Sequence, residues 1–409
     1  MIIKNITENL NFNHIKYNAI NGGDNKSKVS NPCLCSIIII GNSLIETNVI
    51  ISADLIWFSE ILVKNIRRKI YDLTNINESR IVFCASHTHG SPNPDPTIKY
   101  GKKTENICSY LENKIFLLFE KTFNSDEILV DANFQIIEAP DLSINRRRKA
   151  IQFKEFPYFK TQSLPNKKRY VNNTINIIKF IRQDNKKIEN AIILYSCHPV
   201  ADPKGTVGAD YPGYLRNYLK EKMYNNMIFL QGFCGDIRPN VIKKNKSIKD
   251  KIIKVIIGDR FRKIKFGDAE FISKNLAKAI FKNTPLIENT NINTLFKTKI
   301  LNIKIPLQNN SYADKELEII IWIWDKICFI FMSAEVLSGF TFSNIDGYTI
   351  INVGYSNGMI GYLPTRLDIN DGGYEIDKSR PPFGLNSRIS LDAEEIIKNK
   401  IYSEIKNLK

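Results

Sequence analysis

Short, almost wholly apolar runs recur along the chain and predict buried strands. Each run is six or seven residues long, rich in β-branched side chains, and followed by polar residues or glycine. This pattern is typical of strands that are covered on both faces. The six clearest runs are 49–54, 80–86, 191–196, 227–232, 327–332 and 348–353.

Amphipathic stretches lie between several of these runs and predict helices. The helices are expected at 55–71, 214–223 and 268–282, the last with Asp268 as its N-cap. Two apolar runs around the polar segment 183–187 predict a β-hairpin within 173–196. The alternation of strands and helices therefore predicts an α/β fold, with a mixed central sheet flanked by helices.

Residues 1–409 are expected to form a single domain, because no internal repeat and no Gly/Ser-rich linker divides the chain. The polar residues 1–30 are expected to be loosely ordered. The strongly basic segment 241–266 is expected to form a surface excursion. Segment 366–388 is rich in Gly, Pro, Asp and Arg and predicts a long loop of the kind that often carries function.

Composition limits the class of protein. The net charge of +16 comes from lysines scattered among Asn and Ile, so we interpret it as a compositional bias and expect no nucleic-acid partner. Attraction to an acidic substrate or surface stays open. No run of about 18 uncharged apolar residues predicts a membrane span. The N-terminus lacks the apolar segment of a secretory signal, which indicates a cytoplasmic protein.

The cysteines and histidines differ in their surroundings. Four of the seven cysteines lie in apolar runs, where buried free thiols are common, and this argues against a disulfide framework. Three of the four histidines lie in two short motifs, Ser-His-Thr-His-Gly-Ser-Pro at 86–92 and Ser-Cys-His-Pro at 196–199. Neutral imidazole is the commonest zinc ligand in proteins, so these motifs indicate a metal site.

Polar residues follow the predicted strands at the positions where ligands bind in open α/β sheets. They are His87 and His89 after one strand, then His198, Asp236, Glu335 and Tyr362 after or near the ends of later ones. Each has a structural alternative. A single strand-end histidine is usually only hydrogen-bonded, Glu335 can favour a helix N-terminus, and Tyr362 can be a half-buried aromatic. His14, in a polar stretch, is interpreted as a bystander.

Taken in order, the motifs resemble the catalytic domain of the neutral/alkaline non-lysosomal ceramidases, which are zinc-dependent. The family's His-Thr-His-Ser-Gly-Pro, Asn-Arg-Ser-Pro and His-Pro-Thr correspond to residues 87–92, 145–148 and 198–200. Its Gly-Asp-Val-Ser-Pro-Asn, Pro-Gly-Glu and Tyr-Ile/Val-Thr-Thr correspond to 235–240, 333–335 and 362–365, and a second family tyrosine falls on Tyr374. The resemblance implies the same α/β catalytic domain. Because the sequence ends shortly after the second tyrosine motif, we expect the protein to lack the family's C-terminal β-sandwich domain.

The resemblance implies distinct roles for these residues. One Zn²⁺ per chain would be held by His87, His198, Glu335 and Tyr362. His89 would face the substrate and pass a proton to the leaving amine, and Arg146 and Tyr374 would stabilise the oxyanion formed when metal-bound hydroxide attacks a carbonyl. Asp54 and Asp236 are candidates for orienting a ligand histidine, with helix-capping or turn aspartates as the alternative.

Two positions depart from the family pattern. Arg238 stands where the family has a serine that contacts the substrate's polar head. A guanidinium suits a carboxylate or phosphate, so either the substrate carries an anionic group or Arg238 forms an ion pair with an acid such as Asp236. Arg147 and Arg148 replace the Ser-Pro of the family motif and are expected to be solvated or to extend a positive rim.

These observations lead to three hypotheses of function. The first is a zinc-dependent amidohydrolase that cleaves a small-molecule N-acyl amide, soluble or partly lipidic, rather than a bilayer ceramide. The second is a zinc-dependent esterase or deacylase of a specialised pathway, using the same chemistry. The third is a non-catalytic binding protein for an anionic ligand. The sequence indicates no oligomeric state.

Overall fold

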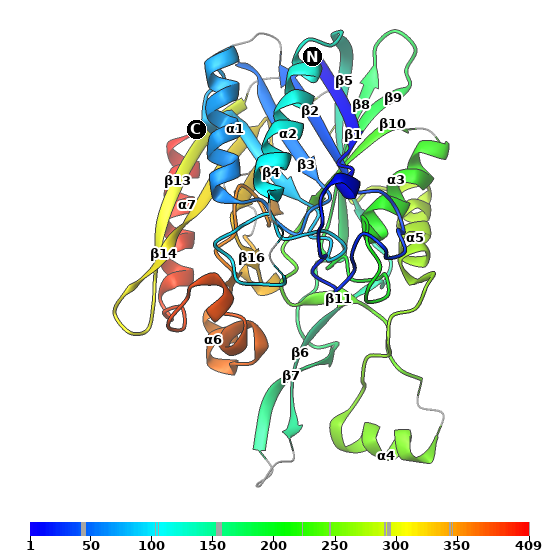
Figure 1. Cartoon of the computed structure of the whole chain (residues 1–409), viewed down its shortest axis with the longest axis vertical. Helices are drawn as coiled ribbons and strands as arrows, with labels where there is room; N and C mark the ends of the chain where they lie inside the picture. Colours follow the sequence, from blue (N-terminus) through cyan, green and yellow to red (C-terminus); the bar gives the residue numbers. More distant parts are fainter. Residues whose placement is uncertain are drawn as a thin grey trace.

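A large mixed sheet forms the centre of the protein. The computed structural model describes the chain except residues 42–45, 103, 105, 153–157, 223, 245–246, 290–291, 293–295, 343–344, 346 and 409, and the side chain of His14. The strand order of the sheet is β10-β9-β8-β5-β1-β2-β3-β4, with β12 also pairing with β5 (Figure 1). Its strands are β1 (Ile2–Asn9), β2 (Leu34–Gly41), β3 (Asn48–Ala53), β4 (Ile81–Ala85), β5 (Ile128–Glu138), β8 (Thr174–Arg182), β9 (Ile188–Tyr195), β10 (Tyr224–Gln231) and β12 (Ile287–Asn289). The pairs β3–β4 and β9–β10 are parallel and the remaining pairs are antiparallel, which confirms the predicted mixed α/β sheet.

Three smaller sheets complete the strand structure. A four-stranded sheet contains β13 (Phe296–Pro306), β14 (Tyr312–Trp324), β15 (Ile327–Met332) and β17 (Thr349–Val353). A three-stranded sheet contains β11 (Ile237–Pro239), β6 (Ser143–Gln152) and β7 (Tyr158–Asn166). The short strands β16 (Glu335–Val336) and β18 (Tyr362–Leu363) pair with each other in parallel.

Both faces of the central sheet are covered, which explains why its strands are apolar at nearly every position. Ile37 and Ile39 of β2 belong to one hydrophobic cluster together with residues of α1 (Glu60–Thr74) and α2 (Ile107–Phe123). Ile38 and Ile40 belong to another cluster, with residues of β14 and β15. Because side chains alternate across a strand, a strand between two packed layers is buried on both sides.

Further helices pack at the two ends of the layers. The pair α3 (Asp210–Lys222) and α5 (Asp268–Lys282) contacts the β5–β10 half of the sheet, and α7 (Ala393–Asn407) contacts β13. The predicted hairpin within 173–196 is confirmed as the antiparallel pair β8–β9. None of the helices in the described part of the chain is long and apolar enough to cross a membrane.

Several predicted boundaries are corrected. Helix α1 begins at Glu60 rather than at 55, because residues 55–58 run into the core as buried, non-helical chain. Helix α3 begins at Asp210, and its predicted last residue, Met223, lies outside the described residues. The N-cap of α5 is Gly267, not Asp268, whose carboxylate instead accepts hydrogen bonds from Arg262.

Two segments predicted as irregular are built into the structure. Residues 1–30 are not a loose tail: β1 lies in the middle of the central sheet, and Asn21 N donates to His89 O. Segment 366–388 contains α6 (Arg366–Asp371), a π-helical turn at Tyr374–Lys378 and a 3-10 turn at Pro381–Phe383. The polar composition of these two segments did not predict their ordered structure, because groups in distant parts of the chain supply many of their hydrogen bonds.

Two elements extend away from the body of the molecule at the same end (Figure 1). One is the hairpin of β6 and β7. The other is α4 (Ile248–Ile257), which lies within the basic segment 241–266 and has no buried residue.

Candidate metal centre and active site

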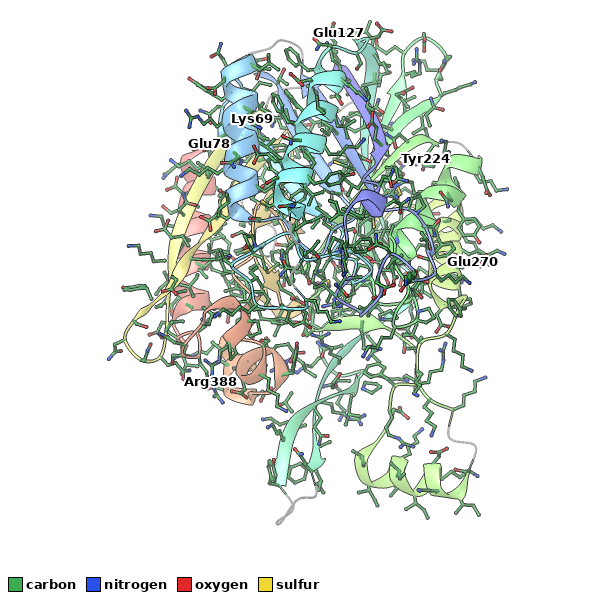
Figure 2. All side chains as sticks on the ribbon, in the orientation of Figure 1. Lys69, Glu78, Glu127, Tyr224, Glu270 and Arg388 are labelled. Atoms are coloured by element: carbon green, nitrogen blue, oxygen red, sulfur yellow. The ribbon has the colours of Figure 1, made fainter. Side chains whose placement is uncertain are left out.

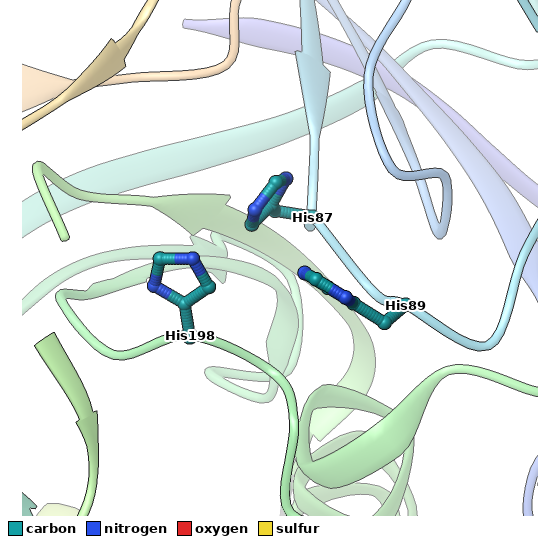
Figure 3. Close-up of side chains that lie close together, drawn as sticks. All are labelled: His87, His89 and His198. Carbon is teal, nitrogen blue, oxygen red and sulfur yellow. The ribbon is translucent and has the colours of Figure 1, made fainter. Parts of the chain in front are cut away.

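Three histidines from two strand ends converge on one point. His87 follows β4 and His198 follows β9, and Figure 3 shows their rings turned toward each other and toward His89. One ligand nitrogen from each of the three rings lies within 4.8 Å of the others. His87 has a φ of 64°, in the left-handed region. Such a conformation is uncommon for a non-glycine residue and occurs most often at functional sites.

Backbone carbonyls hold two of these rings in a ligand-competent orientation. Nδ1 of His87 lies 2.8 Å from Ile56 O, and Nδ1 of His198 lies 2.7 Å from Cys234 O and 2.8 Å from Ile237 O. A ring that donates its Nδ1–H to a carbonyl keeps the Nε2 lone pair for a metal. Nε2 of His87 and Nε2 of His89 are both buried without a hydrogen-bond partner among the described residues. These buried free nitrogens fit a divalent metal ion.

Glu335 supplies a carboxylate at the same point. Its Oε1 lies 2.8 Å from Nε2 of His198 and 3.4 Å from Nε2 of His87. Burial favours the neutral acid, but the neighbouring histidines outweigh it and hold the pKa of Glu335 well below its usual range. The parallel pairing of β16 with β18 sets Glu335 directly opposite Tyr362. Two residues 27 positions apart in sequence are thereby adjacent.

Burial keeps the imidazoles of His89 and His198 neutral. Burial lowers the pKa of His198 to about 4 and lowers the pKa of His89 well below its ordinary value, and the surrounding histidines add to the effect on His89. Neutral imidazole is the form that binds metals. The geometry groups His89 with the other two histidines as a three-nitrogen set, whereas the resemblance assigns it to proton transfer.

Arg146 contacts Tyr362, one of the residues predicted to bind the metal. Its Nη2 donates to Tyr362 Oη at 3.0 Å and to Gly235 O at 2.8 Å, and its Nε donates to Glu375 Oε1 at 2.8 Å. Tyr374 is 38% exposed, and its ring lies edge-on to that of Tyr362 with centroids 6.1 Å apart. The structure thus brings together all seven of the side chains predicted to bind metal or catalyse: His87, His89, Arg146, His198, Glu335, Tyr362 and Tyr374.

Glu375 is a site residue that the sequence reasoning missed. Its two carboxylate oxygens accept from Arg146 Nε at 2.8 Å and from Arg147 Nη1 at 2.5 Å. Arg147 is 1% exposed and also donates to the carbonyls of Asp368 and Gly372. The prediction of a solvated Arg147 is therefore wrong, because a buried carboxylate and two carbonyls replace its water.

Arg148 and Tyr355 also differ from expectation. Arg148 donates to three backbone carbonyls, those of Pro165, Ile257 and Asp259, instead of extending a free positive rim. Tyr355, which the sequence reasoning missed, stacks on the ring of His87 with centroids 4.0 Å apart. It lies two residues past β17, so the strand-end argument used for the histidines would have found it.

Asp54 and Asp236 do not orient the histidines through hydrogen bonds, and this prediction is corrected. Asp54 accepts from Leu34 N at 2.9 Å and pairs with Arg216 at 3.2 Å. Asp236 accepts from Asn145 at 2.6 Å and from the backbone N–H of Ser338 at 2.7 Å. The alternative reading, in which aspartates secure turns, fits these contacts. The orienting role belongs to backbone carbonyls instead.

Arg238 has no acidic partner in the described part of the chain. Both carboxylate oxygens of Asp236 bond elsewhere, so the expected alternative of an Arg238–Asp236 pair is not formed. The guanidinium lies 4.3 Å over the ring of Phe261, and its Nε is buried without a hydrogen-bond partner. Burial, with Arg146 nearby, lowers the pKa of Arg238 to about 10, which leaves it charged at neutral pH.

A cavity of about 440 Å³ lies beside the histidines. His89, Pro199 and Val200 form part of its wall. The charged residues of the wall are Lys204, Lys263, Asp202 and Asp210. The cavity is large enough for a small organic molecule and reaches the site through His89.

Comparison with known proteins supports the architecture. No protein-family model matches the chain, and no curated protein matches its sequence. Among solved structures, neutral ceramidase from Pseudomonas aeruginosa matches 98% of this chain and 73% of its own, with a TM-score of 0.74 and 11% identity. A ceramidase complexed with C2 matches 98% of this chain and 75% of its own, with a TM-score of 0.70 and 10% identity. The chain therefore has the fold of the neutral ceramidases.

Proposed function

We propose that this chain is a zinc-dependent amidohydrolase that cleaves the N-acyl bond of a small molecule. The observation that carries the proposal is the convergence of three buried histidine rings with Glu335, Tyr362 and Arg146 at one point. His87, His198, Glu335 and Tyr362 would hold the ion. A zinc ion bound there would supply a Lewis acid and lower the pKa of a coordinated water toward about 7.

The chain's own residues provide the other requirements of acyl transfer. Arg146 is fixed through Nε and Nη2, so its Nη1 remains to donate to the oxygen that gains charge in the transition state. Tyr374, half-exposed beside Tyr362, is a second donor at this position. His89 lies in the wall of the cavity, where its imidazole would take up a proton and return it to the leaving amine.

We propose that the substrate carries a carboxylate or phosphate. Arg238 supports this, because its guanidinium is half-buried, its Nε has no hydrogen-bond partner and no acid among the described residues pairs with it, so an anion would complete its hydrogen bonds. The substrate would then be an N-acyl amide with an anionic group.

The experiment is a hydrolysis assay of zinc-loaded protein on matched pairs of N-acyl amides and esters, each in an anionic and a neutral form. We expect the anionic amides to be cleaved, and His87→Ala to abolish cleavage. Preference for esters would favour the deacylase alternative. Tight binding of the anionic ligands without turnover, unchanged in His87→Ala, would favour the binding protein.

A further inference from the structure

Helix α4 presents an uncovered apolar face. Ile248, Ile252, Val255 and Ile256 are 78%, 56%, 87% and 49% exposed. Their spacing of i, i+4, i+7 and i+8 places them on one side of the helix, as one amphipathic stripe. In Figure 2 the side chains on the outer side of α4 point away from the body of the molecule. An exposed apolar stripe on a projecting element marks an interaction surface.

Unpaired lysines flank this stripe. Segment 241–266 contains ten basic residues and only two acids, Asp250 and Asp259. Asp250 pairs with Lys243 and Arg260, and Asp259 pairs with Lys254. Successive residues of a helix are rotated by about 100° about its axis, so Lys249 and Lys251 lie on either side of the stripe. Neither lysine forms an ion pair with any described residue.

A second exposed apolar site lies at the same end of the protein. On β7, close to the tip of the β6–β7 hairpin, Phe159 is 74% exposed and Tyr158 is 41% exposed, and the hairpin projects in the same direction as α4 (Figure 1). Both α4 and the β6–β7 hairpin join the body of the protein near the histidine site. Arg148 of β6 donates to the carbonyls of Ile257 and Asp259 at the end of α4, and Lys263 lines the cavity beside His89.

We propose that α4, together with Tyr158 and Phe159 of β7, forms a peripheral docking surface for a bilayer that carries anionic headgroups. A helix with an apolar face flanked by lysines is the pattern that lies in a membrane interface, with its apolar side in the acyl region and its lysines among acidic headgroups. The charge of +16 adds long-range attraction to such a surface. Docking there would hold the cavity near the lipid and give access to a partly lipidic N-acyl substrate.

The test is co-sedimentation of the full chain with phosphatidylcholine vesicles that contain or lack phosphatidylglycerol. We expect binding only to the anionic vesicles, and its loss at an ionic strength of about 1 M. Val255→Glu, which puts a charge in the stripe, should lower the partition at least about tenfold. Reversing both flanking lysines, Lys249→Glu with Lys251→Glu, should have a similar effect. Leu73→Glu in α1, where the residue is 49% exposed, is the matched control and should bind normally.

Three outcomes would overturn the proposal. One is equal vesicle binding by wild type and Val255→Glu, and another is absence of binding to anionic vesicles. The third is a change of oligomeric mass in Val255→Glu with vesicle binding unaltered, which would show a second copy as the occupant. The docking proposal is independent of catalysis: His198→Ala should bind vesicles like wild type, so failure of one proposal leaves the other standing.

Discussion

Nε2 of His198 lies 2.8 Å from Oε1 of Glu335, although 137 residues separate them in sequence. Nδ1 of His198 contacts two backbone carbonyls, and the pairing of β16 with β18 positions the backbone of Glu335. The ring of His198 cannot turn away without losing its two carbonyl contacts, and the strand pairing fixes the backbone position of Glu335. The pair is therefore preorganised to present one nitrogen and one oxygen to a shared ion.

Replacing His198 should remove the metal. We expect His198→Ala to fall from about one zinc per chain to well below half, and hydrolysis to fall at least about a hundredfold, since a ligand matters at least as much as the groups that orient it. Elemental analysis of the purified protein measures the first effect. His14→Ala, at the fourth histidine, is the control and should retain both properties. Equal zinc content in the two variants would contradict the assignment.

Arg146 should act on the transition state and not on metal binding. Arg146→Lys keeps the charge but loses the planar fork that reaches Tyr362, Gly235 and Glu375 together. We expect kcat to fall by about 10²–10³, with zinc content unchanged. Steady-state kinetics on the best substrate of the panel, together with elemental analysis, separate the two effects. A loss confined to KM would instead indicate a ground-state contact.

Glu375 should stabilise the fold in a pH-dependent manner. Burial favours its neutral form, but Arg146 and Arg147 outweigh burial and lower the pKa of Glu375 below its usual range. The unfolded chain binds a proton more readily, so this stabilisation is present above about pH 4.5 and is lost as the pH falls further. Glu375→Gln should lower the free energy of unfolding by about 3–5 kcal/mol near neutral pH, because two guanidiniums lose their counter-charge.

Urea unfolding at about pH 7 and about pH 4 tests this. The difference in free energy of unfolding between wild type and Glu375→Gln should be smaller at the lower pH. Glu395→Gln, at an exposed position of α7, should show little difference at either pH. If Glu375→Gln lost the same free energy of unfolding at both pH values, the ion pairs would not be the source of the loss.

Arg238 should determine preference for an anionic substrate. We expect Arg238→Gln to raise KM for an anionic N-acyl amide by about tenfold or more, since a hydrogen bond to a charged group contributes about 1.5–3 kcal/mol. The KM for a neutral amide with the same acyl chain should stay the same. An unchanged KM for the anionic amide would exclude this role.

Local patterns predicted the strands well because each buried strand carries its signal in its own residues. The predicted ends of the helices were less accurate. Residues 55–58 are as apolar as a helix face, yet they enter the core before α1 begins. The polar composition of residues 1–30 resembles that of a tail, but some of their side chains bond to distant segments, as Asn21 does when it donates to the carbonyl of Thr206. Neither effect is visible in a window of neighbouring residues.

For the site, sequence alone determined which residues gather: scarce histidines after apolar strands and six short motifs in a family order. Tertiary structure decided what holds them. Carbonyls, not Asp54 or Asp236, orient the rings, and Glu375 binds both Arg146 and Arg147. Among the described residues no acid pairs with Arg238. The physical reason is that strand ends follow from local hydrophobicity, whereas hydrogen-bond partners and burial depend on chain segments that meet only in the folded protein.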